Sequence, residues 1–384
     1  MTGSVGKTTT RFFEFNNPEK PLSLRVGGKL ARFTLAYEMY GRMNASKSNV
    51  ILLFHAMTGS QHAAGLNRNV PGLSRRWTGE LHEGWWDAFI GPGKALDTRK
   101  FCVICANYLG GCYGSTGPAS INPQTGKPWG PSFPVLRMVD IVESQLRLLD
   151  SLGVKKLYAV TGASIGGYLS LLLATRHPDR VRTVVPIGTS LETTIVHRIL
   201  NFEQITAIES DLNFKGGAYY DGPRPDVGLA LARRIAHKTF VSPDTLHERA
   251  RGVVVSHKPP HGWYEMNHPI ESYMLHQGEK FVQRFDANTY LRIVDAWQWF
   301  DLVAEAGAND FHDLFERCQQ QEFLVFSIDS DVSFHPQEQS KLVHALKRAH
   351  VPVMWITVHS ETGHDSFLLE PRLFTPHLVQ VLAR

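Results

Sequence analysis

Short apolar runs alternate with longer amphipathic stretches between residues 49 and 190. Continuous apolar runs of this kind are typical of strands buried on both faces of a parallel sheet. One amphipathic stretch, Val135 to Leu152, gathers its apolar side chains on one stripe and is followed by Gly153, so it predicts a helix. The regular alternation predicts an α/β fold. The strands expected in this part of the chain are Val50 to Phe54, Phe101 to Ala106, Leu157 to Val160 and Val181 to Gly188.

The alternation lapses after Ser190 and returns near residue 316. Residues 191–315 have helical patterning, are rich in His, Arg and aromatic residues, and contain no convincing buried strand. We expect them to form a helical lid domain. The core domain then comprises residues 21–190 and 316–384.

The N-terminal region has two expected parts. Residues 24–40 are strand-like and broken by Gly27-Gly28, which predicts an antiparallel hairpin at the leading edge of the sheet. The start of the chain, Met1 to Arg11, is polar and lacks an apolar run, so we do not expect it to act as a signal peptide. We expect residues 1–20 to form a flexible tail.

A turn between a strand and a helix carries the first chemical signal. The strand-like run 156–160 is followed by Thr-Gly-Ala-Ser-Ile-Gly-Gly at residues 161–167, and a helical run begins at Tyr168. The G-x-S-x-G pattern in this context is typical of a nucleophile elbow, whose tight turn exposes the serine at a helix N-terminus. Ser164 is therefore the expected nucleophile.

A nucleophile elbow predicts an acid and then a histidine farther along the chain. The strand-like run 322–328 ends just before Asp331, and the run 351–358 is followed by a loop that contains His364. We expect His364 to accept the serine proton and Asp331 to orient the imidazole. Asp329 remains the alternative acid, because strand boundaries read from sequence are uncertain by a few residues.

Two backbone amides are expected to form an oxyanion hole beside the serine. One is the amide of Ile165, directly after the nucleophile, and the other comes from the loop after an early strand. The strand-like run 49–54 leads into His-Ala-Met-Thr-Gly at residues 55–59. Met57 is the expected second donor.

Several longer segments resemble the homoserine O-acetyltransferase family of α/β-hydrolase-fold enzymes. They occur in order and cover nearly the whole chain, so the resemblance is far more specific than the elbow alone. The matching segments are residues 55–59, 84–97, 110–123, 216–222, 284–290, 330–334 and 363–368.

The resemblance implies transfer of an acetyl group from acetyl-CoA to the hydroxyl of L-homoserine, in methionine biosynthesis, through an acyl-serine. It implies that Ser164, Asp331 and His364 are the triad. Three further positions match substrate-binding residues of the family: Arg233 for the substrate carboxylate, Asp365 for the ammonium group, and the active-site threonine Thr58. An amino-acid zwitterion requires one fixed cation and one fixed anion, and arginine binds a carboxylate with two parallel hydrogen bonds.

Two positions depart from the family pattern. Phe240 replaces a tyrosine that lies seven residues after the carboxylate-binding arginine, and Ile205 stands in a segment where the family tends to carry an arginine. A serine acceptor or a succinyl donor therefore remains open. So does a serine esterase or thioesterase on the same triad, and the third alternative is a binding protein without catalysis.

Composition narrows the expected partners. A net charge of +4 and a pI near 8.8 suit an anionic acyl-CoA co-substrate, but no basic run indicates nucleic acid. No apolar stretch has membrane length, and we expect a cytoplasmic enzyme without a metal or a permanently bound cofactor. The family resemblance implies a homodimer formed through the lid. The histidines of the lid form no metal-binding motif: His237, His257, His261, His268 and His276.

Overall fold

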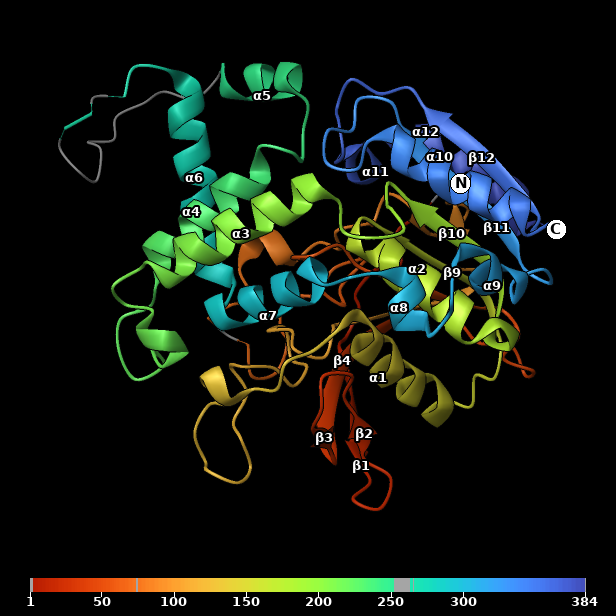
Figure 1. Cartoon of the computed structure of the whole chain (residues 1–384), viewed down its shortest axis with the longest axis horizontal. Helices are drawn as coiled ribbons and strands as arrows, with labels where there is room; N and C mark the ends of the chain where they lie inside the picture. The colour runs from red at the N-terminus through yellow and green to blue at the C-terminus, as the bar shows by residue number, and fades with distance from the viewer. Residues whose placement is uncertain (1–2, 74, 252–262, 265, 384) are drawn as a thin grey trace.

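The computed structural model describes residues 3–73, 75–251, 263–264 and 266–383. Their main sheet has eight strands in the spatial order β1-β4-β8-β5-β9-β10-β11-β12 (Figure 1). The six strands from β8 to β12 are mutually parallel, whereas β4 runs antiparallel to both β1 and β8. The strands are β1 (Arg11–Asn16), β4 (Arg32–Tyr40), β5 (Val50–Phe54), β8 (Cys102–Ala106), β9 (Leu157–Ala163), β10 (Val181–Ile187), β11 (Glu322–Ile328) and β12 (Val353–Val358).

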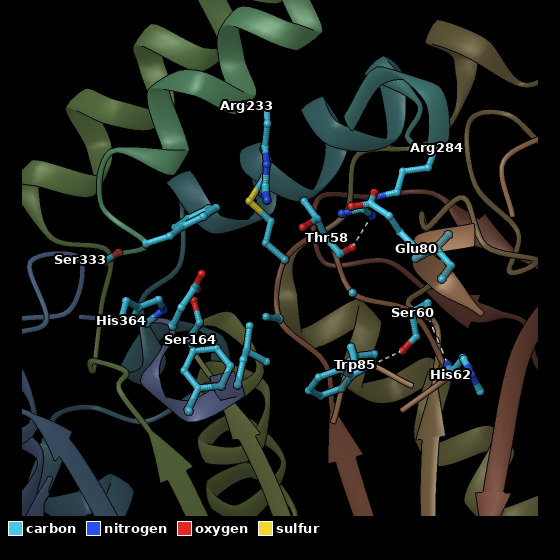
Figure 2. A pocket seen from close by; sticks show the side chains of 18 of the residues that line it. Thr58, Ser60, His62, Glu80, Trp85, Ser164, Arg233, Arg284, Ser333 and His364 are labelled. Carbon is cyan, nitrogen blue, oxygen red and sulfur yellow. Dashed lines mark hydrogen bonds and ion pairs between the residues drawn. The ribbon is translucent and has the colours of Figure 1, made fainter. Parts of the chain in front are cut away.

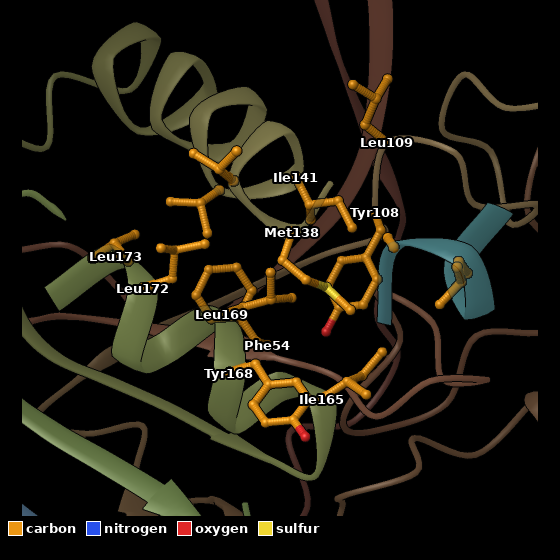
Figure 3. Packing of buried hydrophobic residues seen from close by; sticks show 14 of the residues in the cluster. Phe54, Tyr108, Leu109, Met138, Ile141, Ile165, Tyr168, Leu169, Leu172 and Leu173 are labelled. Carbon is orange, nitrogen blue, oxygen red and sulfur yellow. The ribbon is translucent and has the colours of Figure 1, made fainter. Parts of the chain in front are cut away.

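Both faces of the parallel strands β5, β8, β9, β10 and β11 are buried, which explains their continuous apolar sequences, whereas the edge strand β12 is partly exposed. In β5, Leu52 and Phe54 belong to one hydrophobic cluster, while Ile51 and Leu53 belong to a second cluster on the other face. Successive side chains of a strand point to opposite faces, so one apolar run supplies both clusters. Figure 3 shows the first cluster, where Phe54 packs among side chains of α1 and α2.

The core helices cover these two faces. The first cluster contains side chains of α1 (Met138–Ser151), α2 (Ile165–Arg176) and α10 (Pro336–Arg348), and the second contains side chains of α11 (Ser366–Leu369) and α12 (Pro371–Leu382). The class of fold expected from the alternation of strands and helices is confirmed.

Helices also make up the described part of residues 191–315. Figure 1 shows α3, α4, α6 and α7 grouped to one side of the sheet. Two short helices at the end of this segment, α8 and α9, instead pack against α2 and α10 of the core, so the boundary expected at residue 315 falls too late. The helices are α3 (Ile195–Glu209), α4 (Asp226–His237), α5 (Pro243–Ala250), α6 (Pro269–Arg284), α7 (Ala287–Gln298), α8 (Leu302–Ala306) and α9 (Phe311–Glu316).

The prediction of a flexible tail is wrong for residues 11–16, which form the edge strand β1. Phe13 and Phe15 stand on either side of Glu14 and so point to one face, and Phe15 stacks on Phe33 of β4 with ring centroids 4.7 Å apart. Thr10 is buried and donates a 2.8 Å hydrogen bond to the Glu38 carboxylate. Cross-strand aromatic pairing and this buried contact fix the segment to the sheet.

The hairpin expected at residues 24–40 is only partly correct. Within it, β3 (Lys29–Leu30) pairs in a small separate ladder with β2 (Leu22–Ser23), which lies just before the expected segment, and the rest is β4 of the main sheet. Gly27 and Gly28 do adopt positive φ angles of 110° and 89° at the turn.

Candidate active site

Ser164 lies in a sharp turn between β9 and α2. Its backbone has φ 59° and ψ −127°, a conformation that non-glycine residues adopt only where the surroundings enforce it. The turn is possible because its neighbours lack side chains. A Cβ on Gly162 would lie 2.3 Å from the Gly166 oxygen, and one on Gly166 would lie 2.5 Å from the Phe54 oxygen. The local geometry is that of a nucleophile elbow.

Asp331 and His364 are directly paired. The carboxylate oxygen Oδ2 of Asp331 lies 2.6 Å from Nδ1 of His364. The other oxygen, Oδ1, accepts hydrogen bonds of 2.8 Å from the backbone amides of Ser333 and Phe334. These amides fix the carboxylate, and the carboxylate in turn fixes which ring nitrogen of His364 faces the cavity.

Asp329, the alternative acid, has different partners. Its carboxylate accepts from the Ser360 amide at 3.0 Å and lies 2.8 Å from Nδ1 of the exposed His359. The structure therefore brings Asp331, and not Asp329, to the buried histidine.

The imidazole of His364 is buried. Burial alone would lower the pKa of His364, but the adjacent Asp331 carboxylate outweighs burial and raises this pKa above its ordinary value. Phe334 stacks on the ring, with centroids 5.2 Å apart. Nε2 is buried and has no hydrogen-bond partner among the described residues, so it is available to a group in the cavity.

Ser164 and His364 line one cavity of about 250 Å³. Figure 2 shows His364 and Ser164 on one side of this cavity and Glu80, Ser60 and Trp85 on the other, with Thr58 between them. The walls also include every remaining side chain that the resemblance singled out for substrate binding. These are Thr58, Arg233 and Asp365, and Phe240 lies beside them.

Arg233 reaches the cavity from α4 without an anionic partner. Its guanidinium carbon lies 5.0 Å from the ring centroids of both Phe240 and Phe281. No hydrogen bond or ion pair joins its side chain to any residue that the structure describes. Burial, together with the nearby charge of Arg284, lowers the pKa of Arg233. The two aromatic rings hold the cation in place and leave its hydrogen-bond donors unused.

Asp365 is the matching anion, and its carboxylate has no ion-pair partner among the described residues. Its amide donates a 2.7 Å hydrogen bond to the Phe240 carbonyl, which ties the histidine loop to the segment after α4. Burial raises the pKa of Asp365, although His364 and Arg233 oppose this effect. An unpaired cation and an unpaired anion thus share one cavity, which suits a zwitterionic ligand.

Of the two expected oxyanion donors, Ile165 follows the serine directly, and Met57 lines the same cavity as the serine. Within the described chain, the amides of Ile165 and Met57 make no hydrogen bond to the protein. The loop of Met57 is held by His55, whose ring stacks on Tyr108 with centroids 3.7 Å apart and whose carbonyl accepts the Tyr108 hydroxyl. Burial lowers the pKa of His55 to about 4, so its neutral ring can donate through Nδ1 to the Ala56 oxygen at 2.7 Å.

Three charged residues of the cavity were not predicted: Arg284, Glu80 and Glu83. Arg284, from the last turn of α6, donates to the Tyr113 hydroxyl at 2.7 Å and to the Thr58 carbonyl at 3.3 Å. Glu80 lies in the short helix Gly79–Leu81 and pairs with Arg284. Arg284 is the first residue of one of the segments that resemble the family, and this resemblance could have predicted its place in the site. Nothing in the sequence singles out Glu80.

Ile205 lies outside this cavity. It lines a different hollow together with Gly130 and Asn288, so only Phe240 of the two departures faces the candidate site.

Among the described residues, no group of three or more His, Cys, Asp and Glu side chains could hold a metal ion, and none of the helices has the length and hydrophobicity of a membrane span. His257 and His261, two of the lid histidines, lie outside the described residues. All four cysteines are buried and unpaired.

Comparison with known proteins agrees with this geometry. The sequence profile of the α/β hydrolase fold matches residues 49–371. Among solved structures, esterase E22 superposes with a TM-score of 0.86 at 27% identity, covering 98% of this chain and 100% of the other. The homoserine O-acetyltransferase of Bacillus anthracis superposes with a TM-score of 0.85 at 25% identity, covering 98% of both chains. The class of protein is therefore an α/β-hydrolase-fold enzyme.

Curated relatives define the family more narrowly. The homoserine O-acetyltransferase of Methanococcus vannielii is 40% identical over 96% of this chain and 71% of its own length. The homoserine O-succinyltransferase of an Azoarcus species is also 40% identical, over 96% of this chain and 94% of its own. The chain belongs to the homoserine O-acyltransferase family.

The Asp331–His364 pair has a measurable consequence for protonation. Replacing Asp331 by asparagine removes the charge that opposes burial, so the pKa of His364 should fall below that of wild type. His364 would then lose its proton at a lower pH. Histidine NMR titration in a Ser164→Ala background measures this change. An unchanged His364 titration, with the fold intact by circular dichroism, would show that Asp331 does not control the imidazole.

Proposed function

We propose that the protein transfers an acetyl group from acetyl-CoA to the side-chain hydroxyl of L-homoserine, through an acetyl-serine, as a step of methionine biosynthesis. The proposal rests mainly on one cavity. Ser164 and the paired His364 share it with Arg233 and Asp365, two charged side chains that have no ion-pair partner in the part of the chain that the structure describes. Family membership supports the same reaction.

The first half-reaction forms the acyl-enzyme. His364 takes the proton of Ser164 as its oxygen attacks the thioester carbonyl carbon, and the amides of Met57 and Ile165 stabilise the negative charge on the carbonyl oxygen. The carbon–sulfur bond then breaks, and the proton on His364 passes to the departing thiolate. The acetyl group remains on Ser164, and CoA leaves as a free thiol. CoA is thus a co-substrate and not a resident cofactor.

The second half-reaction transfers the acetyl group. Arg233 binds the carboxylate and Asp365 the ammonium group of homoserine, with Thr58 beside them, so that the acceptor hydroxyl faces the acyl-serine. His364 removes the hydroxyl proton, the new ester bond forms, and Ser164 recovers its proton. Water competes for the same carbonyl, and we propose that the helical segment of residues 191–315 acts as a lid that limits its access.

A hydrolase is the second candidate, because esterase E22 is a solved structure with a TM-score of 0.86 to this chain. The same triad and oxyanion hole would serve hydrolysis, with water in place of the amino acid. The unpaired charges of Arg233 and Asp365 favour the transferase, since ester hydrolysis alone requires neither.

Thiol release separates the two candidates. We expect CoA release from acetyl-CoA to require L-homoserine and to produce O-acetylhomoserine, measured by a thiol reagent and mass spectrometry. L-Serine as acceptor and succinyl-CoA as donor test the related reactions. Ser164→Ala should abolish turnover and leave the circular dichroism spectrum unchanged. Equal release with and without an acceptor would indicate a hydrolase, and normal turnover by Ser164→Ala would refute the mechanism.

Arg233 should contribute mainly to binding of the acceptor. Because a charged hydrogen bond contributes about 1.5–3 kcal/mol, Arg233→Ala should raise KM for homoserine by about 10- to 100-fold and change KM for acetyl-CoA little. Arg234→Ala is the matched control, since Arg234 is the next residue of α4 and does not line the cavity. Equal acceptor KM values for the Arg233 and Arg234 variants would contradict the assignment.

We further propose a homodimer formed through the helical segment. The exposed side of α3 and α4 carries large apolar side chains that a monomer would leave in water. The exposed fractions are 71% for Ile195, 53% for Ile199, 65% for Phe202 and 68% for Val227. We also propose a cytoplasmic location, which suits an acyl-CoA co-substrate and four unpaired cysteines.

A charge in the exposed apolar face should weaken the dimer. Phe202→Glu would place a carboxylate in the proposed interface, so the population should shift toward monomer in sedimentation velocity. Val379→Glu is the control, because Val379 is 47% exposed on α12 of the core. A wild-type protein that is monomeric at micromolar concentration would contradict the proposal.

A further inference from the structure

The cavity is lined by two arginines that differ in whether they form an ion pair. Arg233 has no ion-pair partner among the described residues, whereas Arg284 is paired with Glu80. The proposed acceptor zwitterion uses Arg233 and Asp365. Arg284 is therefore the remaining fixed cation on the described walls that could bind an additional carboxylate.

The guanidinium of Arg284 is held in a defined orientation. Its Nη1 donates to the Tyr113 hydroxyl and to the Thr58 carbonyl, at 2.7 and 3.3 Å. Its Nε lies 3.6 Å from Oε2 of Glu80, and Nη2 has no acceptor within the described part of the chain. Nε and Nη2 form the edge of a guanidinium that binds a carboxylate with two parallel hydrogen bonds, and Glu80 lies against that edge.

Glu80 is held there by a second cation. Lys280 forms an ion pair with Oε1 of Glu80, and Lys280 lies one helical turn before Arg284 in α6. The Glu80 carboxylate thus joins the core to two successive positions on one face of a lid helix. The side chain of Arg284 is only 14% exposed, so its charge is weakly screened by solvent.

The acyl groups named for relatives in the family differ in charge. The curated relatives include acetyltransferases and succinyltransferases at the same 40% identity, and a succinyl group carries a carboxylate that an acetyl group lacks. A carboxylate that enters a partly buried cavity requires a counter-ion, and a second carboxylate near it is strongly unfavourable.

We propose that Glu80 determines the charge of the acyl group that the enzyme accepts. By occupying the Nε edge of Arg284, it removes the counter-ion for a carboxylated acyl group and adds a repelling charge. The cavity therefore selects an uncharged acyl group such as acetyl over succinyl. This assignment rests on the proposed formation of an acyl-serine at Ser164.

Acylation of Ser164 by small esters tests the proposed effect of Glu80 on acyl-group selection, because these substrates require neither CoA nor an amino acid. The measured quantity is the ratio of kcat/KM for p-nitrophenyl hemisuccinate to that for p-nitrophenyl acetate, from nitrophenolate release. Glu80→Gln should raise this ratio by about tenfold, the order expected when one repelling charge is removed and one cation is freed. Glu80→Ala, which leaves more space, should raise it as well. The double variant Glu80→Gln/Arg284→Gln should lose the gain.

Two control variants isolate the cause. Glu83→Gln removes another acidic side chain of the cavity wall that has no ion pair with Arg284, and it should change the ratio much less. Lys280→Gln breaks the other ion pair of Glu80 and leaves its contact with Arg284, so it should not shift the ratio toward hemisuccinate.

An unchanged ratio in both Glu80 variants would overturn the assignment. So would an equal gain in Glu83→Gln or Lys280→Gln, because total charge or attachment of the lid would then be the cause. The ester assay can be interpreted whether or not the protein transfers the acyl group to homoserine. A wild-type protein that acylates Ser164 from esters but never transfers the group to homoserine would refute the transferase and still report on Glu80.

Discussion

The hydrogen bond between Asp331 and His364 is the interaction on which the rest of the site depends. It joins two loops that leave the adjacent parallel strands β11 and β12, and Ser164 follows β9 at the same edge of the sheet. Gly188, at the end of β10, has φ 49°, and a Cβ there would lie 3.3 Å from Asp331. The parallel sheet thus brings together groups distant in sequence, and glycine leaves the space in which they meet.

The charged side chains of the cavity fall into two groups, those with an ion-pair partner and those without one among the described residues. Arg233 and Asp365 are partly buried and have no ion-pair partner among the described residues, which is unfavourable in the free protein and is relieved when a zwitterion binds. Arg284 and Glu80 form an ion pair, and Arg284 connects the helical segment to the loop of Thr58. Unpaired charges are thus expected to provide binding, and paired charges to position the walls and exclude other ligands.

The sequence predicted the parts of the structure that local pattern determines. Apolar runs located the parallel strands, and the order of elbow, acid and histidine selected Ser164, Asp331 and His364 for one site. The edge strand β1 was missed because its alternation is short and depends on pairing with β4. The contact between Glu80 and Arg284 could not be predicted, since it joins residues about two hundred positions apart and exists only after α6 docks on the core. Similarly, only the structure shows that Phe240 faces the cavity and Ile205 does not.

Mass spectrometry of the acyl-enzyme tests directly whether Ser164 carries the acetyl group as an intermediate. The protein is mixed with acetyl-CoA, quenched in acid, digested, and searched for an acetylated peptide, with and without a chase of L-homoserine. We expect acetylation at Ser164, slow loss of the acetyl group in water, and rapid loss to homoserine with formation of O-acetylhomoserine. An acetyl group at another residue, or loss from Ser164 at one rate with and without homoserine, would contradict this expectation.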